Sequence, residues 1–263
     1  MHSSVAVSGS DIQFSPDGTT QEVAGSSARP ISTPVITDTP ISVNGDATPA
    51  PIEAAVKVGP TAEAETLLRY TEPDRAGVVA YVDGRFDDAL ELFSQAIADD
   101  PHDAESLNNL GQVLAKLGRY DEAVDRFEQA LAINPSRWAY HFNLAHAFGE
   151  TGQWDRAVTE YKTAATLSPA EYVTYYNLGR ALHQRGRDQA AIAAYRTAID
   201  LNPTDSTFHL SLGTSYETLE RWDDALSAYH EYLALAPASP RTELLKGHIV
   251  ALMENQDRTR AGG

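Results

Sequence analysis

The chain contains no cysteine among its 263 residues. Without a thiol there is no disulfide, thiolate nucleophile, zinc finger or lipid-bearing cysteine, which excludes a disulfide-stapled secreted domain and a lipoprotein. Positive charge is scarce as well, because 37 Asp and Glu stand against 20 Lys and Arg and give a net charge of −17. Nucleic acids and anionic bilayers are bound through basic surfaces, so this balance argues against either as a partner.

Long apolar runs are also missing from the sequence. No stretch approaches the ~18 apolar residues of a membrane-spanning helix, and the first residues lack a basic segment followed by an apolar run. We therefore expect a cytoplasmic protein that is not held in a membrane.

Residues 1–60 differ in composition from the rest of the chain. They are rich in Ser, Thr, Pro, Gly, Val and Ala and show no helical or strand period, which predicts a disordered tail. Residues 29–41 repeat proline and β-branched residues, which favour extended conformations. The tail is therefore either a linker or a recognition segment for a partner or for the chain's own groove. Residues 61–69 form a lead-in segment, in which a helix is one alternative.

Prolines recur every 34 residues along the rest of the chain, at Pro101, Pro135, Pro169, Pro203 and Pro237. This frame divides residues 70–239 into five repeats, 70–103, 104–137, 138–171, 172–205 and 206–239. Each repeat holds two apolar stripes of helical period. In the second repeat Leu107, Leu110 and Leu114 form the first stripe, and Ala123 with Phe127 forms the second. We therefore expect two helices per repeat, with the proline ending the second one.

Small residues recur in the same frame at two places. One series stands in the middle of the first helix, where glycine costs about 1 kcal/mol relative to alanine, and close approach of the two helices would explain it. Its members are Gly77, Gly111, Ala145, Gly179 and Gly213. The other series stands between the two helices and predicts a left-handed closing residue. Its members are Gly84, Gly118, Gly152 and Gly186, with Glu220 in the fifth repeat.

This pattern resembles the tetratricopeptide repeat family, whose helical hairpins have the same period and the same small, aromatic and proline positions. The resemblance covers residues 70–239 and implies an all-α, right-handed solenoid of stacked helix-turn-helix repeats with a concave groove. The first repeat departs from the family pattern, since Pro73 and Ala76 replace large apolar residues. Residues 240–257 are amphipathic and predict a capping helix, followed by a flexible C-terminus at 258–263.

Asparagine occupies position 6 of the first helix in three consecutive repeats, as Asn109, Asn143 and Asn177. In family structures this helix face lines the groove, and the three residues resemble the asparagine ladder with which some members hold a peptide backbone. A side-chain amide can bond both the C=O and the N–H of an extended strand, whatever the sequence of that strand. The alternative is a solvated polar face, and the sequence leaves both open.

Other side chains on the predicted groove face flank the asparagines: Phe142, Tyr176, Gln112, His146, Arg180, Lys116 and His183. They are candidates either for specificity pockets or for edge packing and solubility. A further family pattern, which clamps a C-terminal carboxylate, is missing because Asp74, Asn108 and Phe142 stand where its first lysine is expected.

Signatures of catalysis are missing too, since the sequence has no Gly-rich phosphate loop, HExxH or GxSxG. No pair of the eight histidines has a spacing that suggests a metal site, so we expect no enzyme activity, no metal and no cofactor. The favoured interpretation is a scaffold or adaptor that binds an extended segment of an unidentified protein in the groove, with the chain's own tail as a further candidate ligand. The alternative is a scaffold that assembles with copies of itself, and the sequence does not set the oligomeric state.

Overall fold

Residues 72–261 are described by the computed structural model of the chain. The predicted tail 1–60, the lead-in segment 61–69 and the last two residues lie outside this range. Within it the chain is all-helical, with eleven helices, which confirms the predicted fold class. They run as follows: α3 (Glu72–Val82), α4 (Phe86–Asp99), α5 (Ala104–Lys116), α6 (Tyr120–Ile133), α7 (Trp138–Glu150), α8 (Trp154–Leu167), α9 (Tyr172–Gln184), α10 (Asp188–Leu201), α11 (Ser206–Thr218), α12 (Trp222–Leu235) and α13 (Pro240–Ala261).

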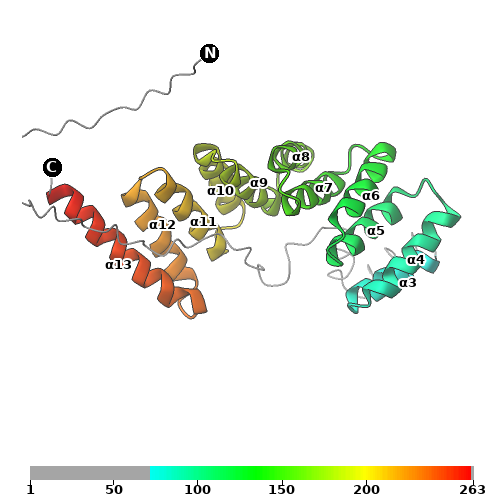
Figure 1. Cartoon of the computed structure of the whole chain (residues 1–263), viewed down its shortest axis with the longest axis horizontal. Coiled ribbons are helices and arrows are strands. Elements are labelled where there is room, and N and C mark those ends of the chain that lie inside the picture. The colour runs from blue at the N-terminus through cyan, green and yellow to red at the C-terminus, as the bar shows by residue number, and fades with distance from the viewer. Residues whose placement is uncertain (1–71, 262–263) are drawn as a thin grey trace, which may run out of the picture. The chain divides into compact units, whose positions relative to one another are not determined.

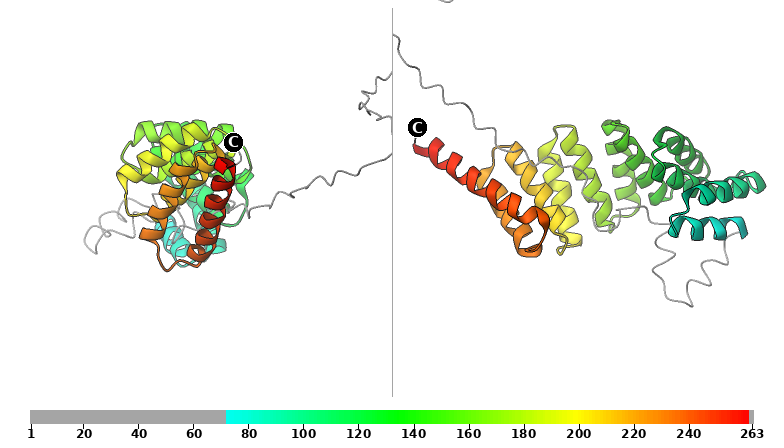
Figure 2. Two further views of the ribbon diagram at one scale, coloured as in Figure 1. Left: turned by 90° about the vertical axis from the view of Figure 1, so that its left-hand side faces the viewer. Right: turned by 60° about the horizontal axis from the view of Figure 1, so that its bottom comes forward.

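The helices pair as antiparallel hairpins that follow one another in sequence order (Figure 1). Each first helix packs on the second helix of its own repeat, and each second helix packs on the first helix of the next repeat. Successive first helices, such as α5 and α7, also touch. Figure 2 shows α13 beside α12 at the C-terminal end of the stack. A hairpin thus buries its apolar stripes only with the help of its neighbours.

A small residue opposite a ring closes each hairpin. The alanines and aromatics of the second helices, such as Ala191 and Tyr195, are all buried. Across from the ring stands the small residue of the first helix, where a methyl group on Gly179 would lie 2.5 Å from Tyr195 Cε1 and one on Gly111 would lie 2.6 Å from Phe127 Cε1. Such contacts leave no room for a larger side chain, so the predicted close approach of the helices is confirmed.

The turn inside each hairpin depends on a left-handed residue. The φ angles of Gly84, Gly118, Gly152 and Gly186 lie between 65° and 74°, as predicted. Glu220 takes the same conformation with φ of 55°, and it is the one non-glycine residue with a positive φ in the range 72–261. The turn is closed by the same hydrogen bonds in both cases, since Arg187 N donates to Leu182 O and Arg221 N to Tyr216 O, each at 2.9 Å.

The second helices end two residues before the repeat prolines, at Asp99, Ile133, Leu167, Leu201 and Leu235. The terminal helix α13 runs to Ala261, beyond the expected end at residue 257. The physical reason is that no glycine or proline interrupts the sequence between Ile249 and Ala261. None of the helices in the described range is long and apolar enough to cross a bilayer.

Candidate functional site

The three asparagines of position 6 lie on α5, α7 and α9, one in each repeat. Asn109, Asn143 and Asn177 are only 1%, 3% and 3% exposed, so the expectation of an exposed face was wrong. The reason is the closeness of successive first helices, because position 6 of α7 meets position 5 of α5. There Asn143 Nδ2 donates to Asn108 Oδ1 at 2.8 Å. The amides therefore lie in the seam between first helices.

Five amide side chains line this seam, and we call them the amide row: Asn108, Asn109, Gln112, Asn143 and Asn177. On α5, Asn109 Oδ1 is approached by Gln112 Nε2 at 3.4 Å and by Asn108 Nδ2 at 3.5 Å. On α9, Asn177 Nδ2 donates to the Val173 carbonyl one turn earlier at 2.9 Å. The amides thus bond partly to one another and partly to their own backbone.

Two acceptors of the amide row are left over. Asn143 Oδ1 and Gln112 Oε1 are buried and have no hydrogen-bond donor within residues 72–261, and the same holds for Thr174 Oγ1 on α9. A buried acceptor without a donor costs about 1–3 kcal/mol. The helical stack itself therefore provides no donor for these oxygens.

Arg180 stands next to the amide row on α9. It is half-buried, and its Nη1 donates to Asn177 Oδ1 at 3.3 Å. Burial raises the pKa of the Tyr161 phenol, an effect that the nearby Arg180 charge opposes. His146, on α7, lies 3.9 Å from the Glu150 carboxylate, and Lys116 is half-buried near the end of α5. Cationic and titratable groups thus flank the row on three successive first helices.

Phe142 and Tyr176, which the sequence offers as pocket residues, are both buried. The Phe142 ring packs edge-on against Tyr161 at 5.5 Å between centroids, and Tyr176 lies 5.0 Å from Phe208 on the next first helix. Packing inside the third hairpin accounts for the Phe142 ring, and packing between the fourth and fifth hairpins accounts for the Tyr176 ring.

His183 belongs to a buried polar cluster between α9, α10 and α11. Its Nδ1 lies 2.5 Å from Asp188 Oδ1 and 3.4 Å from Ser215 Oγ. A catalytic triad needs the carboxylate and the hydroxyl on different ring nitrogens, whereas here both face Nδ1. Ser215 is not among the residues that the sequence singles out. The usable signal for this cluster is Asp188, which stands where the other four repeats have an aromatic residue, Phe86, Tyr120, Trp154 or Trp222.

Two further polar clusters fasten helices together. His141 bonds to Glu160 Oε2 at 2.7 Å and to the Pro135 carbonyl at 2.9 Å, which joins α7 to α8. Glu217 accepts from Tyr229 at 2.7 Å and from His248 at 2.8 Å, which joins α13 to α11 and α12. Burial disfavours the charge of Glu217, but these hydrogen bonds outweigh it and lower the pKa of that carboxyl.

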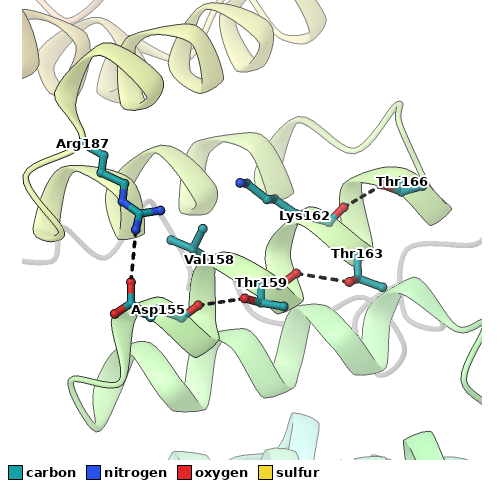
Figure 3. Close-up of a pocket in the computed structure, with 7 residues that line it drawn as sticks. All are labelled: Asp155, Val158, Thr159, Lys162, Thr163, Thr166 and Arg187. Atoms are coloured by element: carbon teal, nitrogen blue, oxygen red, sulfur yellow. Dashed lines mark hydrogen bonds and ion pairs between the residues drawn. The ribbon is translucent and has the colours of Figure 1, made fainter.

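A shallow pocket lies on α8 beside the start of α10 (Figure 3). It is lined by Asp155, Val158, Thr159, Lys162, Thr163, Thr166 and Arg187. The threonine hydroxyls donate to carbonyls of their own helix, at 3.0 Å in the case of Thr159 and Asp155 O, and Arg187 lies 3.7 Å from the Asp155 carboxylate. The threonine hydroxyls of this pocket are therefore already bonded to their own helix. Within the described helices no group of three or more His, Asp or Glu side chains could hold a metal ion.

The family model of the tetratricopeptide repeat matches the chain at residues 75–137, 142–206 and 189–240, which is more than half of its length. The chain belongs to the tetratricopeptide repeat family. The match spans the same hairpins that carry the amide row. No curated protein matches the chain in sequence.

Solved structures of tetratricopeptide repeat proteins are similar in fold. MamA from Desulfovibrio magneticus RS-1 superposes with a TM-score of 0.60 at 22% identity, over 62% of this chain and 93% of that one. MamA of AMB-1 gives a TM-score of 0.60 at 25% identity, over 64% of this chain and 100% of that one. TTC0263 of Thermus thermophilus gives 0.51 at 26% identity, over 69% and 97%. These likenesses establish the architecture, and membership of the family is consistent with a role in protein interaction.

Proposed function

We propose that this tetratricopeptide repeat chain is a non-catalytic scaffold that binds an extended peptide segment of a partner protein along the amide row. The observation that carries the proposal is the pair of buried acceptors, Asn143 Oδ1 and Gln112 Oε1, that have no donor in the described helices. They lie on successive first helices and require N–H groups that the stack does not provide.

An extended backbone is the ligand that fits such a row. Successive first helices lie roughly 10 Å apart, and an extended strand advances about 3.3 Å per residue, so acceptors on neighbouring helices address about every third ligand residue. Each bond contributes about 0.5–1.5 kcal/mol net. A few such bonds, less the cost of association, correspond to a micromolar affinity.

Binding can be tested with a displayed library of random peptides and with the recovered peptides in calorimetry. Substituting Asn143 and Gln112 together by alanine should weaken each recovered peptide about tenfold, because both acceptors without a donor in the described helices are removed at once. Unchanged affinity in this variant would rule out the amide row as the binding site.

A control must distinguish a loss of binding from a loss of stability, since Asn143 and Gln112 are buried and hydrogen-bonded within the fold. Val158→Ala truncates a buried side chain on α8 and should cost about 2 kcal/mol, yet it should leave the affinity unchanged. Circular dichroism must show that every variant is folded at the assay temperature.

A second candidate, assembly of the chain with copies of itself, is favoured by exposed apolar side chains on both end helices. These are Val79 and Val82 on α3, and Leu244, Val250 and Met253 on α13. End-to-end contact of this kind is heterologous and would build open filaments. Light scattering over a concentration series tests it, because a constant monomer mass excludes assembly, whereas a mass that grows with concentration and falls in Leu244→Lys supports it.

A further inference from the structure

Arg180 has no acidic partner within the helices that the structure describes. Its hydrogen bond goes to the neutral Asn177 Oδ1 at 3.3 Å. Arg185 and Arg187, a few residues away, instead share the Asp155 carboxylate. In a chain with 37 acidic and 20 basic residues, a half-buried guanidinium without a carboxylate is unusual. Its fork of donors suits a carboxylate that approaches from outside.

Arg180 stands next to hydrogen-bond acceptors that also lack a partner in the described helices. The amide row next to it contains the buried oxygens of Asn143 and Gln112, which have no hydrogen-bond donor in the described helices. An extended segment could supply a carboxylate to Arg180 and a backbone N–H to Asn143 Oδ1 at the same time. The acidic residue would then lie about three residues along the segment from the residue whose N–H donates to Asn143. This step rests on the proposed function of the amide row.

The chain itself contains a segment of this chemistry, residues 30–58. Proline and β-branched residues favour an extended backbone around Asp38, which stands between Pro34 and Pro40. The other two acids of the segment have different surroundings, because Asp46 follows a glycine and Glu53 precedes two alanines. We infer that residues 30–58 bind the amide row of their own chain and that Asp38 pairs with Arg180.

The length of chain between Asp38 and α3 permits this contact. From α3 to α9 there are three repeat steps, roughly 30 Å, whereas the residues between Asp38 and Glu72 can span about 100 Å when extended. A tethered segment has an effective concentration on the order of 1 mM, far above a micromolar dissociation constant. The segment therefore competes with partners, and a partner must displace it.

The absence of cysteine makes the test direct, because introduced cysteines are then the sole labelling sites. Spin labels at Ser42→Cys and at Gln184→Cys, which is exposed one turn after Arg180, report the distance between the segment and α9 in the full chain. We expect a narrow distribution of label-to-label distances, centred at a short distance. Arg180→Glu should broaden this distribution, and adding Asp38→Arg to that variant should make it narrow again, since the reversed pair of charges attracts.

Matched controls distinguish this pair from general charge effects. Arg187→Glu changes an exposed arginine near the same helix and should leave the distance unchanged, and Asp46→Arg should fail to restore the Arg180→Glu variant. A broad distribution in the unsubstituted chain, or a narrow one that survives Arg180→Glu, overturns the inference.

The partner assay separates this inference from the proposed function. Replacing residues 30–58 by a Gly/Ser segment of equal length should tighten binding of the library peptides at least tenfold, because the internal competitor is gone. If the peptides bind with unchanged affinity, the internal segment is not a competitor, although the amide row still binds peptides. If the labels approach each other and no library peptide binds, the internal contact stands and the proposed function falls.

Discussion

Glu220 is the one residue of the described range that has a side chain and adopts a positive φ. It holds the left-handed turn that glycine holds in the other four repeats, with φ of 55°. A Cβ makes this conformation costly, whereas glycine adopts it without steric penalty. We expect Glu220→Gly to stabilise the fold by about 0.5–1 kcal/mol, seen as a higher midpoint in urea denaturation.

The reverse change in the third repeat is the matched control for this prediction. Gly152 has the same conformation with φ of 74°, and a Cβ there would meet no atom of the described helices within 4 Å. Gly152→Glu should therefore lower the midpoint through the backbone alone. If the two substitutions shift it in the same direction, backbone strain is not the cause.

Gly179 shows the opposite situation, because here the available space rather than the backbone excludes a side chain. A methyl group would lie 2.5 Å from the Tyr195 ring, and that ring is fully buried. We expect Gly179→Ala to destabilise the fold by about 1–3 kcal/mol despite the higher helix propensity of alanine. Urea denaturation measures the loss.

Gly247 on α13 provides the control, since it also lies inside a helix, but a methyl group there would meet no atom of residues 72–261 within 4 Å. Gly247→Ala should stabilise α13 by up to about 1 kcal/mol through propensity alone. A similar effect of both alanines would contradict the packing argument.

At the scale of elements, the hydrogen bonds of His141 contribute to the pairing of α7 with α8. His141 donates from one ring nitrogen to Glu160 and from the other to the Pro135 carbonyl, which requires both nitrogens to be protonated. Burial opposes the charge, but these hydrogen bonds outweigh it and raise the pKa of His141 above its ordinary value of 6.5.

This shift predicts how stability depends on pH. A pKa that is higher in the folded chain adds stability that is complete below the ordinary histidine pKa and is lost as the pH rises through the folded value. The difference in unfolding free energy between the unsubstituted chain and His141→Gln should therefore be larger near pH 6 than near pH 9. Urea denaturation at both pH values measures it, and a difference that grows with pH would refute the assignment.

The elements also show how far a repeat pattern predicts structure. The 34-residue spacing predicts the helices α5, α7, α9 and α11, because a proline follows every second helix and a glycine closes the turn of every hairpin except the last, where Glu220 takes its place. The burial of the amide row could not be predicted in the same way. The apolar stripe of a helix indicates which face packs on the other helix of the same hairpin. The burial of the amide row depends instead on the distance between the first helices of neighbouring repeats.

At the scale of the whole molecule, acidic charge is in large excess, with a net charge of −17. Most ion pairs of the described helices are exposed and contribute little, so repulsion between the remaining carboxylates opposes the compact state. We expect the urea midpoint to rise when NaCl is increased from about 0.01 M to about 0.2 M, because the Debye length falls from about 30 Å to below 10 Å.

A matched variant tests the electrostatic origin of this effect. Replacing the exposed acids Asp125 and Asp200, which form no ion pair in the described helices, by asparagine makes the net charge less negative and should weaken the salt dependence. A midpoint that falls with salt would mean that attractive pairs outweigh the repulsion.

The sequence by itself determined the period, the family and the residues that close each hairpin, because these depend on local backbone chemistry and on apolar spacing within one or two turns. The glycines such as Gly84 predict the turns, the alanine and aromatic pairs predict the second helices, and the repeat prolines predict where those helices end. The tertiary structure alone decided that Asn143 meets Asn108, that Asn143 Oδ1 and Gln112 Oε1 find no donor in the described helices, and that Arg180 has no carboxylate there. Such contacts join side chains of different repeats, so they depend on how closely the first helices pack and not on the sequence of any one of them.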